Sequence, residues 1–411
     1  MMLTQSHGNK NAVNMNIALL GAFCLFLSAV EYMIPKPLPF MRIGLANLPL
    51  MMALDILPFS SFLVLICIKV IGQGLITGTL FSYIFIFSLT GTFLSALLMF
   101  LLRRIFGKEH ITLIGIGTAG AFVSNISQLA LAKVFIFQEN ARYIAPPFLA
   151  AGIVTGIVLG VFCEVFIRKS VWYKNNLLTA EDTELHRDAG LETTRTCLNI
   201  NRKDAQMKSI RHDVYNRIFS AKALFIAGFL ILPALLFNPG TESRVLQFLF
   251  FWFLALLCGK KTNPVFTVLI IVFIIAFNLI IPYGRVIFSI GAFKVTSGAL
   301  TAGIHRAITL AALVMLSKLT VRQDLKIPGA FGEILAESLR VFSVIMSQKY
   351  RVTAKNFFLD IDNLMLELGR EQRADNKEQR TDNKDQIRTA PIGYVVLAVV
   401  VVISWLPWVI N

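Results

Sequence analysis

Long apolar segments alternate with short polar ones along most of the chain. A helix needs roughly 20 apolar residues to cross a bilayer, because each residue adds about 1.5 Å. Eleven segments approach that length, in a group of six, a group of four and a single last one: about 15–34, 45–57, 58–80, 82–102, 111–137 and 144–167; 223–237, 245–258, 263–282 and 298–317; and 392–410. The pattern predicts an all-α polytopic membrane protein with about 11 transmembrane helices, although 45–57 and 245–258 are short for a crossing.

Composition excludes the other broad classes of protein. Of 411 residues, 56% are hydrophobic, 34 are Phe and only 15% are charged. Soluble domains are about 45–50% apolar, and disordered chains are lower still. The five cysteines lack the spacing of metal ligands, so we expect neither a disulfide scaffold nor a metal site. The first apolar segment has no cleavage site after it and is expected to stay as a membrane helix.

The basic residues follow the membrane topology. If the N-terminus is cytoplasmic and each apolar segment crosses once, cytoplasmic segments hold 30 of the 39 Lys and Arg residues and outer loops hold six. This asymmetry is the one that the positive-inside rule predicts. The excess of basic residues is therefore explained without a nucleic-acid partner. We expect a multi-pass protein of the inner (cytoplasmic) membrane, in contact with the lipid bilayer.

Polar segments divide the chain. Eleven basic and seven acidic residues mark 168–222 as a solvated linker. Later, apolar residues at helical spacing from Phe331 to Ile345 indicate amphipathic helices, lying on the membrane or covered by a partner or by the second unit. A tandem heptad, EQRADNK then EQRTDNK, lacks the apolar positions of a coiled coil. The predicted parts are a leader (1–14), a six-helix unit (15–168), a cytoplasmic linker (169–222), a four-helix unit (223–320), cytoplasmic amphipathic helices (321–370), a charged tether (371–390) and a final transmembrane helix (391–411).

Polar residues inside the first unit indicate a binding cavity. The hairpin 31–49 holds four prolines, which cannot continue a helix, and Glu31 and Arg42 lie in it with Asn47. An ion pair that closes the turn is the alternative explanation for its charges. Lys69 lies midway along an apolar segment and shares a helix face with Gln73. A lysine at that depth needs a carboxylate, a water-filled cavity or an anionic ligand.

A second polar face belongs to the fifth apolar segment, where Asn125 and Gln128 lie one turn apart. Such amides often join helices without binding a ligand. Together with Lys69 they predict a polar cavity beneath the first outer loop. The substrate-binding residues expected there are Glu31, Arg42, Asn47, Lys69, Gln73, Asn125 and Gln128. Because the positive charges of Lys69 and Arg42, with Lys133 nearer the outer end of its segment, exceed the single carboxylate of Glu31, the ligand is expected to carry an acidic or carbonyl group.

Three further residues are expected at helix interfaces. Ala18 and Ala22 form a pattern of small residues that permits close helix approach. Arg306 lies so deep in the tenth segment that its charge needs a partner. We favour a structural contact with a carbonyl or carboxylate of a neighbouring helix. Motifs of catalysis are absent from the sequence: there is no P-loop, no Asp-rich DDxxD cluster, no H-E-x-x-H and no G-x-S-x-G. We therefore expect no catalytic residues and no cofactor.

The hairpin VEYMIPKPLPFMRIGLAN (30–47) resembles the hallmark of a membrane family known as Gx transporter or heptaprenyl diphosphate synthase component I. That family is similar to the substrate-binding (S) components of energy-coupling factor transporters, which have six helices, an Ala-x-x-x-Ala pattern in the first helix and a structured first outer loop. Residues 285–320 resemble part of the transmembrane coupling (T) component, with an Arg that matches Arg306. The Ala-Arg-Gly or Ala-Arg-Ser motifs that dock ATPases are missing, since the single Ala-Arg is Ala141-Arg142.

The resemblance implies an S-like and a T-like unit fused in one chain. Such a protein would bind a small organic solute, vitamin-like or isoprenoid-related, and would be powered by separate ATPase subunits. Its mechanism would be rotation of the S-like unit in the membrane. Two alternatives stay open. One is a non-catalytic accessory subunit of isoprenoid or quinone synthesis, with a prenyl synthase subunit as partner. The other is a scaffold for a membrane redox or flavin-transfer system.

Overall fold

The computed structural model describes residues 2–33, 43–175, 215, 218–238, 240–260, 264–290, 293–347, 360–363, 365–366 and 391–410. These residues are helical almost throughout, which confirms the prediction of an all-α polytopic membrane protein. Five segments are long and apolar enough to cross a membrane, and one of them holds two helices: Val13–Met33, Phe59–Thr77, Tyr83–His110, Leu113–Lys169 and Ser297–Thr320. Arg42 and the predicted heptad tether lie outside the described residues.

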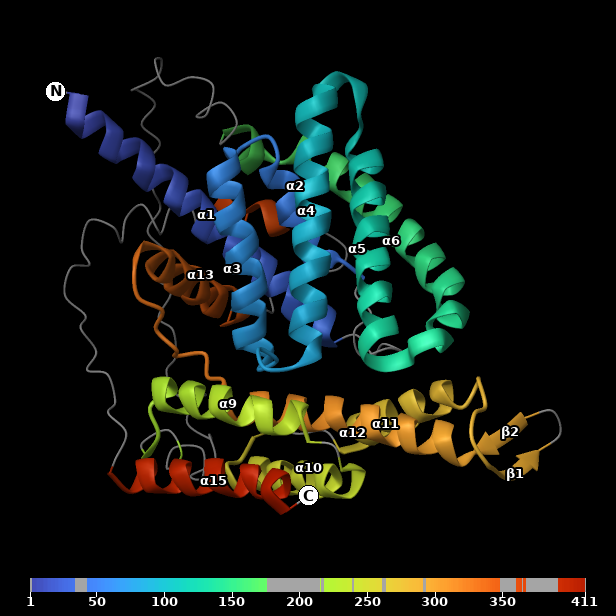
Figure 1. Ribbon diagram of the computed structural model, residues 1–411. Helices are drawn as coiled ribbons and strands as arrows, with labels where there is room; N and C mark the ends of the chain where they lie inside the picture. The colour runs from blue at the N-terminus through green and yellow to red at the C-terminus, as the bar shows by residue number, and fades with distance from the viewer. Residues whose placement is uncertain are drawn as a thin grey trace.

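Five long helices form the first unit and run side by side (Figure 1). Their bounds are α1 (Met2–Met33), α3 (Phe59–Thr77), α4 (Tyr83–His110), α5 (Leu113–Ala132) and α6 (Ala141–Lys169). The predicted leader continues α1 rather than preceding it, because the helix begins at Met2. Particular residues fix where two other helices begin or end. Thr112 caps the start of α5 by accepting from the Gly115 N–H at 3.2 Å. Gly78, with φ of 63°, ends α3.

The apolar segment 45–57 does not form the crossing helix that its composition predicts. It holds a single 3-10 turn, η1 (Leu45–Asn47), and a short helix, α2 (Leu48–Ala53). Six helical residues span only about 9 Å. Every residue of α2 is buried, against α1, α3 and α6. The segment is apolar because it lies inside the protein, and composition alone cannot distinguish that burial from contact with lipid.

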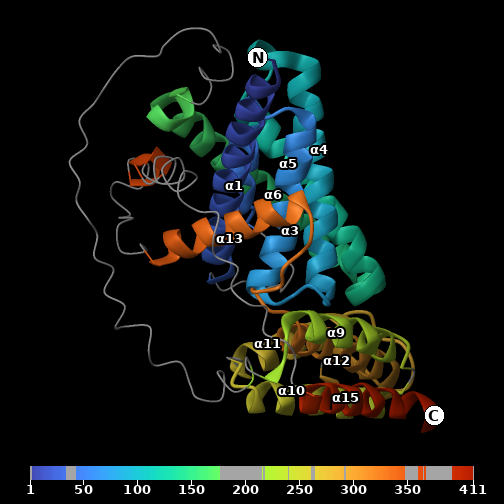
Figure 2. The same ribbon diagram turned by 90° about the vertical axis from the view of Figure 1, so that its left-hand side faces the viewer.

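The second unit lies across one end of the first (Figures 1 and 2). Its helices run crosswise to those of the first unit, with α12 at the centre and α15 packed on α9. Their bounds are α9 (Ala221–Leu236), α10 (Thr241–Leu257), α11 (Pro264–Asn278), α12 (Ser297–Thr320) and α15 (Pro391–Ile410). An antiparallel hairpin that the hydrophobic pattern did not predict, β1 (Val286–Ile290) with β2 (Phe293–Thr296), joins α11 to α12.

An amphipathic helix, α13 (Ala330–Ser347), crosses α1 and α3 of the first unit (Figure 2). Its apolar face buries Leu335, Val341 and Ile345, each about 2% exposed. Small residues allow the contact, since a Cβ on Gly21 of α1 would lie 2.8 Å from the Ser338 hydroxyl of α13. The apolar face predicted to lie on the membrane or to be covered by a partner or by the second unit is therefore covered by the first unit.

A second contact joins the segment after α13 to the first unit. The Asp362 carboxylate, 7% exposed, accepts from the Ser170 hydroxyl and from the backbone N–H groups of Val171 and Trp172, at 2.9 and 3.2 Å. These donors begin the short helix 171–175 after α6. A carboxylate is favourable there because the first N–H groups of a helix have no partner within it.

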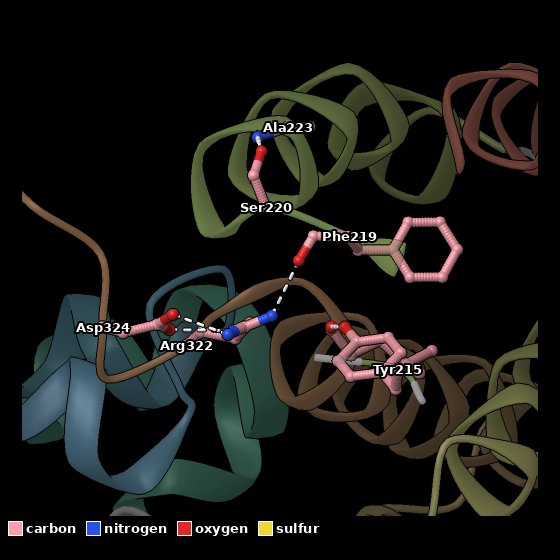
Figure 3. A network of polar contacts seen from close by, with 7 residues as sticks. Tyr215, Phe219, Ser220, Ala223, Arg322 and Asp324 are labelled. Atoms are coloured by element: carbon pink, nitrogen blue, oxygen red, sulfur yellow. Dashed lines mark hydrogen bonds and ion pairs between the residues drawn. The ribbon is translucent and has the colours of Figure 1, made fainter. Parts of the chain in front are cut away.

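The predicted cytoplasmic ends of α9 and α12 meet in a polar network (Figure 3). The Arg322 guanidinium donates to both oxygens of Asp324, at 2.8 and 2.5 Å, and to the carbonyl oxygen of Phe219 at 2.8 Å. The Tyr215 hydroxyl donates to the Leu319 carbonyl oxygen. Burial raises the pKa of Tyr215 above its ordinary value. The network holds the start of α9 against the end of α12.

Candidate functional site

A polar cavity of about 30 Å³ lies inside the first unit. Residues from α1, the segment 43–51, α3, α4, α5 and α6 line it. Five of the seven residues predicted to bind substrate are among them: Glu31, Asn47, Lys69, Asn125 and Gln128. Gln73 lies one contact away, because Ser88, which lines the cavity, donates to its side-chain oxygen at 3.4 Å.

Lys69 is 3% exposed, near the middle of α3. Its ammonium group donates to the side-chain oxygen of Asn47 and, at 3.3 Å, to the hydroxyl of Thr92 on α4. Neutral oxygens thus replace part of the water that a charged amine requires. Residues far apart in sequence meet at this group, so the ammonium joins α3 to α4 and to the segment 43–47 in the wall of the cavity.

The backbone beside Lys69 is not helical. Gly44 has φ of 89°, a left-handed conformation that glycine adopts readily, and it precedes η1. Glu31 of α1 holds this segment by accepting from the Ile43 N–H at 2.8 Å. Irregular backbone at membrane depth is tolerated where it is buried in protein or lines a cavity. Transporters use such interrupted segments to build their binding sites.

Amide side chains of α5 form the opposite wall. The Asn125 amide donates to the Phe148 carbonyl oxygen of α6 at 2.9 Å, and Gly152 leaves the space that this amide fills. The Gln128 amide donates to the Ser124 hydroxyl at 2.9 Å. Gln128 is 1% exposed, and its side-chain oxygen has no hydrogen-bond partner among the described residues. A buried acceptor without a partner is costly, so this wall favours a water or ligand that donates a hydrogen bond.

The cavity is narrow in this conformation. Its 30 Å³ has room for about two water molecules, whereas pockets for organic ligands usually span roughly 300–1,000 Å³. A larger solute requires the walls to separate. The irregular segment from Ile43 to Asn47 is the wall best suited to such movement, because η1 is a single turn and Gly44 separates it from Ile43.

Two family models match parts of the chain. Residues 20–166 match the model of a family described as heptaprenyl diphosphate synthase component I. This match covers 147 of the 411 residues and lies within the first membrane unit, which we call the component I unit. Residues 221–323 match a domain of unknown function, DUF8519. No curated protein and no solved structure is detectably similar to the chain.

The component I unit meets the second unit at the residues around Arg306. The Arg306 guanidinium donates to the side-chain oxygen of Asn278 at 2.5 Å and to the Ile136 carbonyl oxygen at 3.5 Å. Asn278 in turn donates to the same carbonyl at 3.2 Å, and Asn140 donates to the Asn278 carbonyl at 3.2 Å. Arg306 therefore lies at the boundary between units and outside the cavity. Lys133 is also outside it, 57% exposed and paired with Glu139 at 3.3 Å.

Ala18 and Ala22 are buried, at 1% and 0% exposure, and share the face of α1 that carries Gly21. Sequence reasoning missed Thr92, Ser88, Ser124 and Thr155, which also line the cavity. Hydroxyl side chains are poor indicators of a site, because in membrane helices they often bond their own backbone. The spacing of Ser88 and Thr92, one turn apart on α4, was the available signal.

Proposed function

We propose that the chain is a membrane transport component of the energy-coupling factor type. In this proposal the component I unit binds a small organic solute, and the second unit couples binding to separate ATPase subunits. The family match and the apolar helices fit a membrane accessory or transporter-like component. The observation that carries the finer proposal is the cavity, where a buried lysine, a glutamate and two amides surround irregular backbone at membrane depth.

The residues that line the cavity limit the charge and the polar groups that a ligand would carry. Among the described residues it holds one lysine, Lys69, and one glutamate, Glu31, and its other polar side chains are neutral. Because Lys133 lies elsewhere, the predicted excess of positive charge over Glu31 becomes smaller. We therefore propose a small neutral or zwitterionic molecule, vitamin-like or isoprenoid-related. It would offer a carbonyl oxygen to Lys69 and a donor to Gln128.

The crosswise arrangement of the two units supports a rotating mechanism. The basic ends of the first unit include Arg103 and Lys169, whereas those of the second unit include Lys260 and Arg322. These helix ends point in different directions, because the helices of the two units run crosswise (Figure 1). Two bundles that cross cannot both lie along the normal of one flat membrane. We propose that in this arrangement the component I unit lies flat in the plane of the inner membrane. To take up solute it stands upright, with its N-terminus on the cytoplasmic side.

The contact between α13 and α1 would transmit the movement. One face of α13 holds the component I unit, and the other exposes Glu333 and Arg340. Arg340 pairs with Glu337 at 2.7 Å on that outer face. ATPase subunits would bind there without the missing Ala-Arg motifs. We propose no catalytic step in the chain itself.

The second candidate is a non-catalytic accessory subunit of heptaprenyl diphosphate synthesis. The description of the family favours it, because component I implies a partner prenyl synthase subunit. In this case the cavity would bind an isoprenoid-related molecule, and the second unit would serve as a membrane anchor.

Affinity purification of the intact chain from its own membranes distinguishes the two. Transport predicts co-purified ATPase subunits that are lost from the double variant Glu337→Ala with Arg340→Ala. They should be kept by the matched control Glu164→Ala with Arg168→Ala, which removes a surface ion pair of the component I unit. Recovery of a prenyl synthase subunit would support the accessory role. Recovery of the chain without any partner, from the native protein and from the control variant alike, would contradict coupling to ATPase subunits.

A further inference from the structure

A second pocket lies at the end of the first unit farthest from the second unit, where α4 ends (Figure 1). It is an open pocket of about 560 Å³ between the turn 54–59, which leads into α3, and the last turns of α4. The polar cavity described above shares none of its lining residues. Its size falls within the range of pockets that hold organic ligands, roughly 300–1,000 Å³.

When the component I unit stands upright in the membrane, the depth of the pocket corresponds to the lipid headgroups. From Tyr83 to Arg103, α4 rises by twenty residues, or about 30 Å, which equals the thickness of the hydrocarbon core. Gly107 then breaks the helix with φ of 70° and ψ of −175°. The basic residues at this end of α4 therefore lie where phosphate groups of one leaflet are found.

Positive charge dominates the pocket. Among the described residues, Asp55 is the only acidic one that lines the pocket, and both of its oxygens bond Arg103, at 2.9 and 2.8 Å. Arg104 and Lys108 also line the pocket, and both are exposed, with no ion pair to any described residue. The lining thus carries two positive charges that no carboxylate of the pocket neutralises. Basic groups at this depth attract anionic headgroups.

The floor of the pocket is apolar. The ring of Phe100 lies 5.2 Å from the ring of Phe59, which is 48% exposed. Leu54, Ile56, Leu57 and Pro58 also belong to the apolar lining. A free inorganic anion would gain nothing from these side chains, whereas the chain of a lipid would cover them. Charge and apolar surface together match a phosphate group attached to a hydrocarbon chain.

We propose that this pocket binds an anionic phospholipid, with its phosphate between Arg104 and Lys108 and its first chain carbons against Phe59 and Phe100. Asp55 is a positioning residue, because it fixes Arg103 beside the phosphate. The site is independent of what the polar cavity binds. It ties the cytoplasmic end of the component I unit to the anionic leaflet.

Native mass spectrometry of the full chain, released from micelles with equal phosphatidylglycerol and phosphatidylcholine, tests the proposal. Bound phosphatidylglycerol should predominate. A basic side chain near the membrane surface contributes about fivefold to such binding, so the double variant Arg104→Gln with Lys108→Gln should lose about 25-fold. Both residues are exposed, so the variant should fold as the native chain does.

The matched control is Arg168→Gln with Lys169→Gln, which removes two exposed basic residues from the end of α6. It should keep the preference for phosphatidylglycerol. An equal loss in both double variants would overturn the pocket, because charge anywhere on that face would then suffice. Displacement of the lipid by an equal concentration of inorganic diphosphate would overturn the role of the hydrocarbon chain. Failure of diphosphate to displace it would support that role.

Discussion

Replacing Asp362 with Ala should release the segment that carries it from the component I unit. The carboxylate accepts from the backbone N–H groups of Val171 and Trp172, at 2.9 and 3.2 Å. Hydrogen bonds to a charged group contribute about 1.5–3 kcal/mol each, so the two together contribute at least about 3 kcal/mol. That free energy corresponds to a factor of about 100 in the docking equilibrium.

Hydrogen exchange of the two amides measures this factor directly. In the Asp362→Ala variant, both amides should exchange about 100-fold faster. Asp362→Asn keeps one acceptor oxygen and the shape but loses the charge, so its exchange should be intermediate. Glu333→Ala, which removes an exposed carboxylate of α13, is the control and should leave both amides unchanged. Unchanged exchange in Asp362→Ala would refute the argument that this side chain holds the segment.

Three further perturbations test other contacts. Gly21→Val should lower the free energy of unfolding by about 1–3 kcal/mol, because its Cβ would lie 2.8 Å from Ser338. The control Gly115→Ala, where the nearest atom is 3.5 Å away, should change the free energy of unfolding little. Equal thermal midpoints for the two variants would contradict the close contact at Gly21. Asn278→Leu should cost about 1–3 kcal/mol by removing an oxygen that Arg306 bonds and a donor to Ile136; an unchanged thermal midpoint would show that the boundary does not need it. Burial, and then the nearby Asp55 carboxylate, raises the pKa of Tyr173 above its ordinary value. Its contribution to stability is therefore complete below about pH 10 and is lost as pH rises, so thermal midpoints should fall above about pH 10 less steeply in Tyr173→Phe than in the native chain.

Sequence reasoning located much of the cavity because helical periodicity fixes which residues share a face. Asn125 and Gln128 face the cavity together for that reason, and Lys69 was notable because a charge at membrane depth is costly. The hydroxyls were harder to predict, because periodicity does not show whether a hydroxyl faces a cavity or its own backbone: Thr118 shares the same periodic stripe but donates to its own helix, at the Ile114 carbonyl oxygen. Its short side chain reaches backbone or cavity equally well.

Other features depend on contacts that no local pattern specifies. The segment 45–57 is apolar because it is buried, and only the positive φ of Gly44 and the six-residue length of α2 show that it forms no crossing helix. The apolar face of α13 was evident from its periodicity, but that periodicity is the same whether lipid, ATPase or α1 covers it. The crosswise packing of the two units depends on long-range contacts such as Phe81 with Ser317 and Phe225.

The most direct test of the transport proposal is to identify what the polar cavity retains. The native chain is purified in mild detergent and denatured, and the released small molecules are identified by mass spectrometry. We predict one small polar molecule, near one per chain, in the native protein and in the control Lys133→Met, whose lysine is exposed. Lys69→Met should lose it. The same molecule at equal amounts in Lys69→Met, or no small molecule in any of the three, would contradict a solute-binding cavity at Lys69.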